Sequence, residues 1–351
     1  MDRKTFIKLS SVTMAGTLLN PDTAFQEKEL TNWAGNFIFS TRNLYHPHSV
    51  TEVQDLIKKY PKVKALGTRH CFNRIADSKY NLISLKEMNG DISLDENAHT
   101  VTVNGGVKYG ELSPYLDSKG YALHNLASLP HISVAGAVAT ATHGSGIKNG
   151  NLSSAVSAME IVTASGNVIN LFREKDGEKF LAAVVGLGAF GIVTKVTLDI
   201  LPTFMVRQDV YENLPLEELK KHFNEIEESG YSVSLFTDWQ QKSINEVWIK
   251  TKIEDGKTYN FPADFFGAKA ATKNLHPIAA LSAENCTDQM GVPGPWYERL
   301  PHFKMGFTPS SGKELQSEYF VPIRNAVDAI LAIQKLGSKI GPHLFIQYLQ
   351  S

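Results

Sequence analysis

Hydrophobic side chains recur at helical spacing over residues 53–60. Just before them, Ser49 and Glu52 stand three residues apart, which is the spacing of a capping box. Pro61 cannot continue a helix, and the apolar residues at 63–66 then form a short run of their own. The pattern therefore predicts a helix that begins after Ser49 and ends before Pro61, followed by a buried strand.

Glycines separate the elements that follow. The apolar residues 100–103 predict a strand, and residues 109–119 predict a helix with Gly120 as its C-terminal cap. Residues 160–170 alternate around a turn that contains Gly166, which predicts a hairpin. This order of strand, glycine turn and helix indicates an α+β fold.

The segment 186–191 matches the pattern Gly-x-Gly-x-x-Gly of dinucleotide-binding folds. That fingerprint needs a strand before the glycines and a helix after them. Here residues 178–185 have helical character and residues 192–198 alternate as a strand, so the order is inverted. We therefore predict a tight helix-to-strand turn and no Rossmann site.

The composition shifts after Pro202 towards longer charged helices and more aromatic strands, which predicts a domain boundary near residue 205. The elements expected beyond it are a helix over 214–229, strands over 231–237 and 245–251, a helix over 326–336 capped by Gly337, and an apolar strand over 344–349.

Composition and charge narrow the function. A chain of 351 residues is long enough for two domains, and 42% hydrophobic and 20% charged residues are typical of a globular protein. The 35 basic residues are balanced by 36 acidic ones. The sequence therefore lacks the excess of positive charge that is typical of proteins that bind nucleic acid or an anionic membrane. Cys71 and Cys286 belong to no metal-binding or disulfide pattern, so we expect no metal site.

The N-terminal residues differ in character from the rest. Arg3 and Lys4 precede a mildly apolar stretch at 9–19 that is too short to span a membrane. The arrangement resembles a twin-arginine export signal, although Lys4 stands where the second arginine is usual. Residues 1–25 are therefore either an export signal, which implies a periplasmic protein, or an N-terminal extension of a cytoplasmic one.

Candidate chemistry begins at the loop 65–73, Ala-Leu-Gly-Thr-Arg-His-Cys-Phe-Asn. A strand that breaks at Gly67 exposes backbone N–H groups beside an arginine and a histidine, which is the chemistry of an anion-binding loop. Neutral His70 could be alkylated by an electrophilic cofactor and then hold it covalently. The alternative is a turn at a strand end with a surface histidine.

A second unusual stretch covers residues 127–146, where nearly every side chain is Ser, Thr, Gly, Ala or Val. Such small side chains let another surface approach the backbone closely. A wall against a flat ligand, a tight contact between helices and a flexible loop are the alternatives. Ser, Thr and β-branched residues disfavour a long helix, and Pro130 disfavours simple flexibility.

Together these two stretches resemble the vanillyl-alcohol-oxidase superfamily of FAD enzymes, and specifically the alditol oxidases. Other similar stretches are 32–36, 231–239, 292–296 and 314–319, and the resemblance runs from about residue 31 to about residue 342. It implies a two-part FAD-binding domain over 30–205, followed by an α+β substrate (cap) domain with a central antiparallel sheet over 206–351.

Site residues follow from the resemblance by position. His70 would form the 8α-histidyl bond to FAD, and Ser128 matches a serine that lies at both substrate and flavin. His124 and His131 are expected to be structural. Further cofactor contacts are implied at Gly67, Thr68, Arg69 and Cys71 on one loop, at Ser133, Gly136, Ala137, Val138, Ala139 and His143 on the other, and at Ile192 and Val193 on the adenine side.

The implied reaction passes a hydride from a polyol or sugar-derived substrate to the covalently bound flavin, after which O₂ is reduced to H₂O₂. In the family, a Glu-Ile-Arg strand follows the position of Pro342 and holds the polyol, whereas this chain reads Ile-Gln-Tyr-Leu-Gln-Ser from Ile346. The substrate domain is therefore expected to be truncated at its C-terminus. Alternatives to an alditol oxidase are a flavin-binding remnant without catalysis and an aldonolactone oxidase.

Overall fold

The computed structural model describes residues 29–88, 90, 92–259, 261–306 and 314–350. The expected export signal or extension at residues 1–25 lies outside these residues. Thr31–Ser351 forms one compact unit, and the fold described below belongs to it. None of the helices in the described ranges has the length and apolarity that a membrane crossing requires.

The unit begins with a small parallel sheet in the order β1-β3-β2, made of β1 (Leu44–Tyr45), β3 (Asn81–Ile83) and β2 (Val63–Ala65). The connection from β1 to β2 is α2 (Val50–Lys59). Half of the predicted capping box is present, because the Glu52 N–H donates to Ser49 Oγ, whereas the Glu52 carboxylate accepts from the N–H of His48 and not from that of Ser49. The predicted helix and strand are confirmed.

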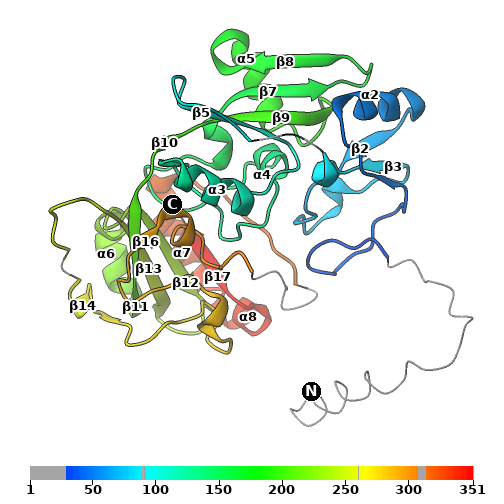
Figure 1. Cartoon of the computed structure of the whole chain (residues 1–351). Coiled ribbons are helices and arrows are strands. Elements are labelled where there is room, and N and C mark those ends of the chain that lie inside the picture. The colour runs from blue at the N-terminus through cyan, green and yellow to red at the C-terminus, as the bar shows by residue number, and fades with distance from the viewer. Residues whose placement is uncertain (1–28, 89, 91, 260, 307–313, 351) are drawn as a thin grey trace, which may run out of the picture. The chain divides into compact units, whose positions relative to one another are not determined.

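A five-stranded antiparallel sheet follows, in the order β4-β5-β9-β7-β8 (Figure 1). Its strands are β4 (Ser93–Asp95), β5 (Thr100–Asn104), β9 (Ile192–Asp199), β7 (Val156–Val162) and β8 (Val168–Phe172). The predicted hairpin is β7 with β8, and Gly166 takes the turn with a φ of +79°. The glycine turn joins α5 (Arg173–Val184) to β9, so the helix-to-strand prediction is confirmed.

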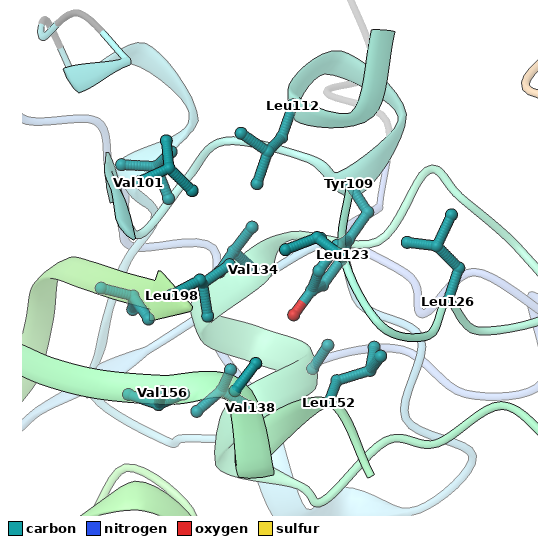
Figure 2. Close-up of a cluster of buried hydrophobic side chains, with 14 of the residues drawn as sticks. Val101, Tyr109, Leu112, Leu123, Leu126, Val134, Val138, Leu152, Val156 and Leu198 are labelled. Carbon is teal, nitrogen blue, oxygen red and sulfur yellow. The ribbon is translucent and has the colours of Figure 1, made fainter. Parts of the chain in front are cut away.

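The largest hydrophobic core lies between this sheet and two helices, α3 (Tyr109–Ser118) and α4 (Val134–Ala139). Figure 2 shows Val134 of α4 between Leu198 of β9 and Tyr109 of α3, with Val138 of α4 between Val156 and Leu152. The short strands β6 (Tyr121–Ala122) and β10 (Leu201–Pro202) pair beside this core. Only six residues of the small-residue stretch are helical, as its Ser and Thr content predicted.

A second antiparallel sheet follows residue 205, in the order β14-β15-β11-β13-β12-β17, with β16 also paired to β11. Whether residue 205 divides two domains stays a prediction. The strands are β11 (Met205–Pro215), β12 (Ser232–Thr237), β13 (Ser243–Ile253), β14 (Asp264–Phe265), β15 (Ala268–Ala270), β16 (Gly294–Pro295) and β17 (Gln347–Gln350). The helices are α6 (Leu216–Glu227), α7 (Ala326–Gln334) and α8 (Gly337–Ile340), and short 3₁₀ turns lie at Arg74–Ala76, Leu85–Glu87, Leu152–Ala155, Ala283–Asn285, Trp296–Glu298, Ile323–Asn325 and Gly341–His343.

Two sequence predictions in this half are wrong. Leu214 belongs to β11 and not to the following helix, and β11 itself was not predicted because its buried Gln208 and Asp209 hide the apolar alternation. Gly337 begins α8 and does not cap α7. A Cβ at Gly337 would lie 2.4 Å from the Trp239 carbonyl oxygen, so the glycine is needed for a close backbone approach.

The glycine turn before β9 leads to a prediction about stability. Gly191 has a φ of +137°, and a Cβ there would lie 2.2 Å from the Val162 carbonyl oxygen. We expect Gly191→Ala to lower the free energy of unfolding by about 3 kcal/mol or more, as measured by urea unfolding. Gly188→Ala is the matched control, since Gly188 also has a positive φ but nothing lies within 4 Å of its Cβ position, and it should cost only about 1 kcal/mol. Equal losses in the two variants would contradict the steric explanation.

Candidate functional site

The loop after β2 is held in place by the segment that precedes β1. The Trp33 N–H donates to the Arg69 carbonyl oxygen at 2.8 Å, and the Asn32 side-chain amide donates to the Cys71 carbonyl oxygen at 3.1 Å. The Arg69 guanidinium donates to the Thr31 carbonyl oxygen at 2.9 Å. Arg69 adopts a φ of +66°, a strained conformation that these contacts stabilise. The loop is therefore fixed by hydrogen bonds to a distant segment of the chain, which does not fit the alternative of a simple surface turn.

His70 lies in this loop and contacts two aromatic rings, which also contact each other. It stacks on Trp33 with the ring centroids 4.4 Å apart, and its Nε2 lies 2.5 Å from Nε2 of His131. Burial, and then the neighbouring His131, lower the pKa of His70 to about 3. Burial and Lys108 lower the pKa of His131 as well. Both imidazoles are thus neutral at neutral pH, and one N–H is donated between them.

The loop and the small-residue stretch meet at two glycines. A Cβ on Gly67 would lie 2.9 Å from Ser133 Oγ, and a Cβ on Gly136 would lie 2.8 Å from the same atom. Ser133 Oγ is buried and has no hydrogen-bond partner among the described residues, although the Ser133 N–H donates to Thr68 Oγ1 at 3.3 Å. A buried hydroxyl without a partner costs free energy. This glycine-lined cradle, with its available hydroxyl, fits a polar cofactor group.

The other expected cofactor contacts lie on the small-residue stretch and at the start of β9, and they offer less side chain to a ligand. The side chains of Ala137, Val138 and Ile192 are buried in hydrophobic clusters, so any contact that they make with a cofactor must use the main chain. Ala139 and Val193 are half-buried. Their expected contacts with a cofactor stay a prediction.

His143 forms a link that the sequence did not indicate. Its Nε2 lies 3.6 Å from a Glu318 carboxylate oxygen, and its Nδ1 lies 2.8 Å from the Gly144 carbonyl oxygen. The contact with the Glu318 carboxylate, together with the hydrogen bond to the Gly144 carbonyl oxygen, raises the pKa of His143, and the same His143–Glu318 pair lowers the pKa of Glu318. Phe320 packs edge-on against the His143 ring at 5.6 Å. The segment around Glu318 therefore lies against the small-residue stretch.

Ser128 also contacts a residue that sequence reasoning missed. Its Oγ lies 2.8 Å from Nδ1 of His302, and its carbonyl oxygen accepts hydrogen bonds from the N–H groups of His302 and Phe303. His302 stands alone in its stretch of sequence, so no spacing signal pointed to it. Among the described residues, no three His, Cys, Asp or Glu side chains gather as metal ligands would.

Comparison with known proteins agrees with this site. Residues 42–171 match the family described as "FAD binding domain". Over 319 residues the chain is 44% identical to the alditol oxidase of a Streptomyces species, and the match covers 90% of this chain and 74% of that protein. The L-gulono-1,4-lactone dehydrogenase of Mycobacterium tuberculosis is 34% identical over 182 residues, which are 51% of this chain and 42% of that protein.

Solved structures show the same fold. Cholesterol oxidase from Brevibacterium sterolicum superimposes with a TM-score of 0.58 at 17% sequence identity. The superposition covers 67% of this chain and 50% of the other. At this level of identity the similarity concerns the fold alone.

The lowered pKa of His70 predicts a pH dependence of stability. In the unfolded chain the imidazole has its ordinary pKa of 6.5, and in the folded chain the pKa is about 3. Between these values the unfolded state binds more protons, so the free energy of unfolding falls as the pH falls, by at most about 1.4 kcal/mol per pH unit from this residue.

Urea unfolding of cofactor-free protein between about pH 4 and pH 7 measures this dependence. His70→Phe should show a shallower loss of stability than the unchanged chain as the pH falls. His99→Asn is the matched control, since His99 is exposed and asparagine tolerates its φ of +50°. An unchanged slope in His70→Phe would contradict a buried, neutral His70.

Proposed function

The chain belongs to the alditol oxidase family of FAD-dependent oxidases, within the vanillyl-alcohol-oxidase superfamily, and on this premise we propose that it oxidises an alditol with FAD attached covalently to His70 and O₂ as electron acceptor. The observation that carries the covalent part is the neutral His70 ring, which contacts Trp33 and His131 and belongs to the loop that also lines the Ser133 cradle.

The cradle residues fit FAD through backbone and hydroxyl groups. Ser133 Oγ is the buried hydroxyl that would gain a partner on cofactor binding, and the absence of side chains at Gly67 and Gly136 leaves room for this hydroxyl between the two backbone segments. We propose that further residues contact FAD through their main chain or side chain. These are Thr68, Arg69, Cys71, Ala137, Val138, Ala139, His143, Ile192 and Val193.

Covalent attachment would join a ring nitrogen of His70 to the 8α carbon of the flavin in place of one of that carbon's hydrogens, which leaves as a proton. The two electrons released would reduce the flavin and pass on to O₂, and the new bond needs a nitrogen lone pair on His70. A protonated imidazole has no free lone pair, whereas the low pKa of His70 keeps the ring neutral. When a nitrogen of the ring is alkylated, the other nitrogen gives up its proton more readily. His131 Nε2 lies 2.5 Å from His70 Nε2 and is placed to accept that proton.

Bound FAD supplies the hydride acceptor and the reactivity towards O₂. The protein must then hold the alcohol and share its hydroxyl proton. Ser128 is proposed for this task, because it lies three residues before His131 in the loop that contacts His70, and its side chain is only half-buried. An alditol is the favoured substrate class, since the match to the alditol oxidase is longer and closer than the match to the lactone dehydrogenase.

Replacement of His70 tests the covalent bond. We expect flavin fluorescence to stay with the polypeptide after denaturing electrophoresis of the unchanged protein, and to run at the dye front for His70→Ala. His124→Ala is the control, because the His124 ring contacts the Gly150 carbonyl oxygen and neither loop histidine. Two outcomes would overturn the proposed bond. One is flavin fluorescence that stays with the His70→Ala polypeptide, and the other is fluorescence of the unchanged protein that runs at the dye front.

Anaerobic mixing with substrates tests the reaction. Xylitol should bleach the flavin absorbance, and readmitted O₂ should restore it with formation of H₂O₂. Bleaching by an aldonolactone and not by xylitol would make the chain an aldonolactone oxidase. Flavin that no substrate bleaches would support the alternative of a flavin-binding remnant.

A further inference from the structure

His302 is a buried polar residue that connects Ser128 to the second sheet. Only 2% of its surface is exposed, and both ring nitrogens have partners. Nδ1 lies 2.8 Å from Ser128 Oγ, and Nε2 lies 3.2 Å from Oγ of Ser234 on β12. The ring therefore bridges the proposed substrate serine and a serine of a strand in the second sheet.

The direction of these hydrogen bonds follows from the proton of Ser234. The Ser234 hydroxyl donates to Ser145 Oγ at 3.0 Å, and the Gln350 side-chain amide donates to Ser234 Oγ at 3.4 Å. A serine hydroxyl has one proton to donate. Ser234 can therefore only accept from His302, and Nε2 of His302 must carry the proton.

The other ring nitrogen of His302 is then an acceptor. Burial, and then the nearby Lys250, hold the pKa of His302 well below its ordinary value, so the ring is neutral and carries a single proton. With that proton on Nε2, Nδ1 presents a lone pair to Ser128. The Ser128 hydroxyl donates its proton to this lone pair.

We infer that His302 is a positioning residue for the oxidation, because it holds the Ser128 proton and so leaves Ser128 Oγ as a hydrogen-bond acceptor for the reacting hydroxyl of the alcohol. The inference rests on the proposed function, which places Ser128 at the substrate. No bond is broken at His302. The free lone pairs of Ser128 orient the substrate O–H before a hydride leaves the carbon atom that bears this hydroxyl.

The surroundings of His302 keep this arrangement fixed. Its ring packs edge-on against Phe236 at 5.3 Å and lies 5.4 Å from the Trp248 ring. Its backbone N–H donates to the Ser128 carbonyl oxygen at 3.1 Å. A flip of the ring would break both side-chain hydrogen bonds inside a packed core, so the ring has one orientation.

Two amide variants of His302 separate positioning from packing. In His302→Asn the side-chain oxygen can take the place of Nδ1 and accept from Ser128, whereas in His302→Gln the amide reaches the place of Nε2 and serves only Ser234. We expect His302→Gln to lower kcat for xylitol roughly tenfold or more with little change in KM, and His302→Asn to recover most of that loss. Equal losses in both variants, with flavin content unchanged, would overturn the inference.

Ser128→Ala provides the link to the proposed function. If His302 acts through Ser128, the double variant Ser128→Ala/His302→Gln should be no slower than Ser128→Ala alone. Multiplied losses would show that His302 acts independently of Ser128. Full activity in Ser128→Ala would overturn both the role of Ser128 and the inference.

A measurement without turnover keeps the two proposals apart. In flavin-loaded protein labelled with ¹⁵N-histidine, the signals that disappear in His302→Asn identify His302 among the 11 histidines of the chain. We expect a neutral ring with the proton on Nε2. A proton on Nδ1 would overturn the inference even if the protein oxidises alditols, and a proton on Nε2 would support the positioning of Ser128 even if xylitol is not the substrate.

Discussion

The close approach of two backbone segments at Gly67 and Gly136 is the constraint on which the site depends. A side chain at either position would displace Ser133 Oγ from its present place, so the loop after β2 and the start of α4 meet around this hydroxyl with glycine on both sides. The contact leaves the Ser133 hydroxyl buried without a partner among the described residues, at a cost of about 1–3 kcal/mol. Cofactor binding would recover that free energy, which couples the stability of the fold to occupancy of the site.

Electrostatics at this site depend on burial more than on formal charge. The chain has a net charge of −1, and the atoms that line the cradle are backbone groups and a hydroxyl. Charged imidazoles would be costly here, so His70 and His131 share a proton as neutral rings. Neutrality is also what the proposed bond between His70 and the flavin requires of the ring.

The small-residue stretch has a second face, which contacts the second sheet. Ser145 Oγ lies 2.5 Å from Ser232 Oγ, and the Asn149 side-chain amide donates to the Tyr231 carbonyl oxygen at 3.0 Å. A Cβ at Gly146 would lie 2.4 Å from that same carbonyl oxygen. Small side chains thus let the second sheet approach this backbone, and the proposed cofactor site lies along the same stretch. The bridge from Ser128 through His302 belongs to this second face.

Local patterns in the sequence determined the elements whose signals are local. The capped helix α2, the hairpin at Gly166 and the helix-to-strand turn before β9 each depend on neighbouring residues, and all three were predicted. The loop around His70 and the small-residue stretch were also recognisable, since their chemistry lies in their residue types. Strand β11 was not, because buried polar side chains in it find partners only in the folded sheet, as Gln208 does with Thr287.

Only the tertiary structure decided which side chains meet. His70 and His131 are 61 residues apart, and Ser128 and His302 are 174 residues apart. No local sequence pattern around a single histidine identifies the distant residue that it will contact. Its partner, its tautomer and its pKa follow from burial and from hydrogen bonds that form when the two sheets and their loops pack together. The sequence therefore determined which residues could do the chemistry, and long-range packing determined how they are arranged to do it.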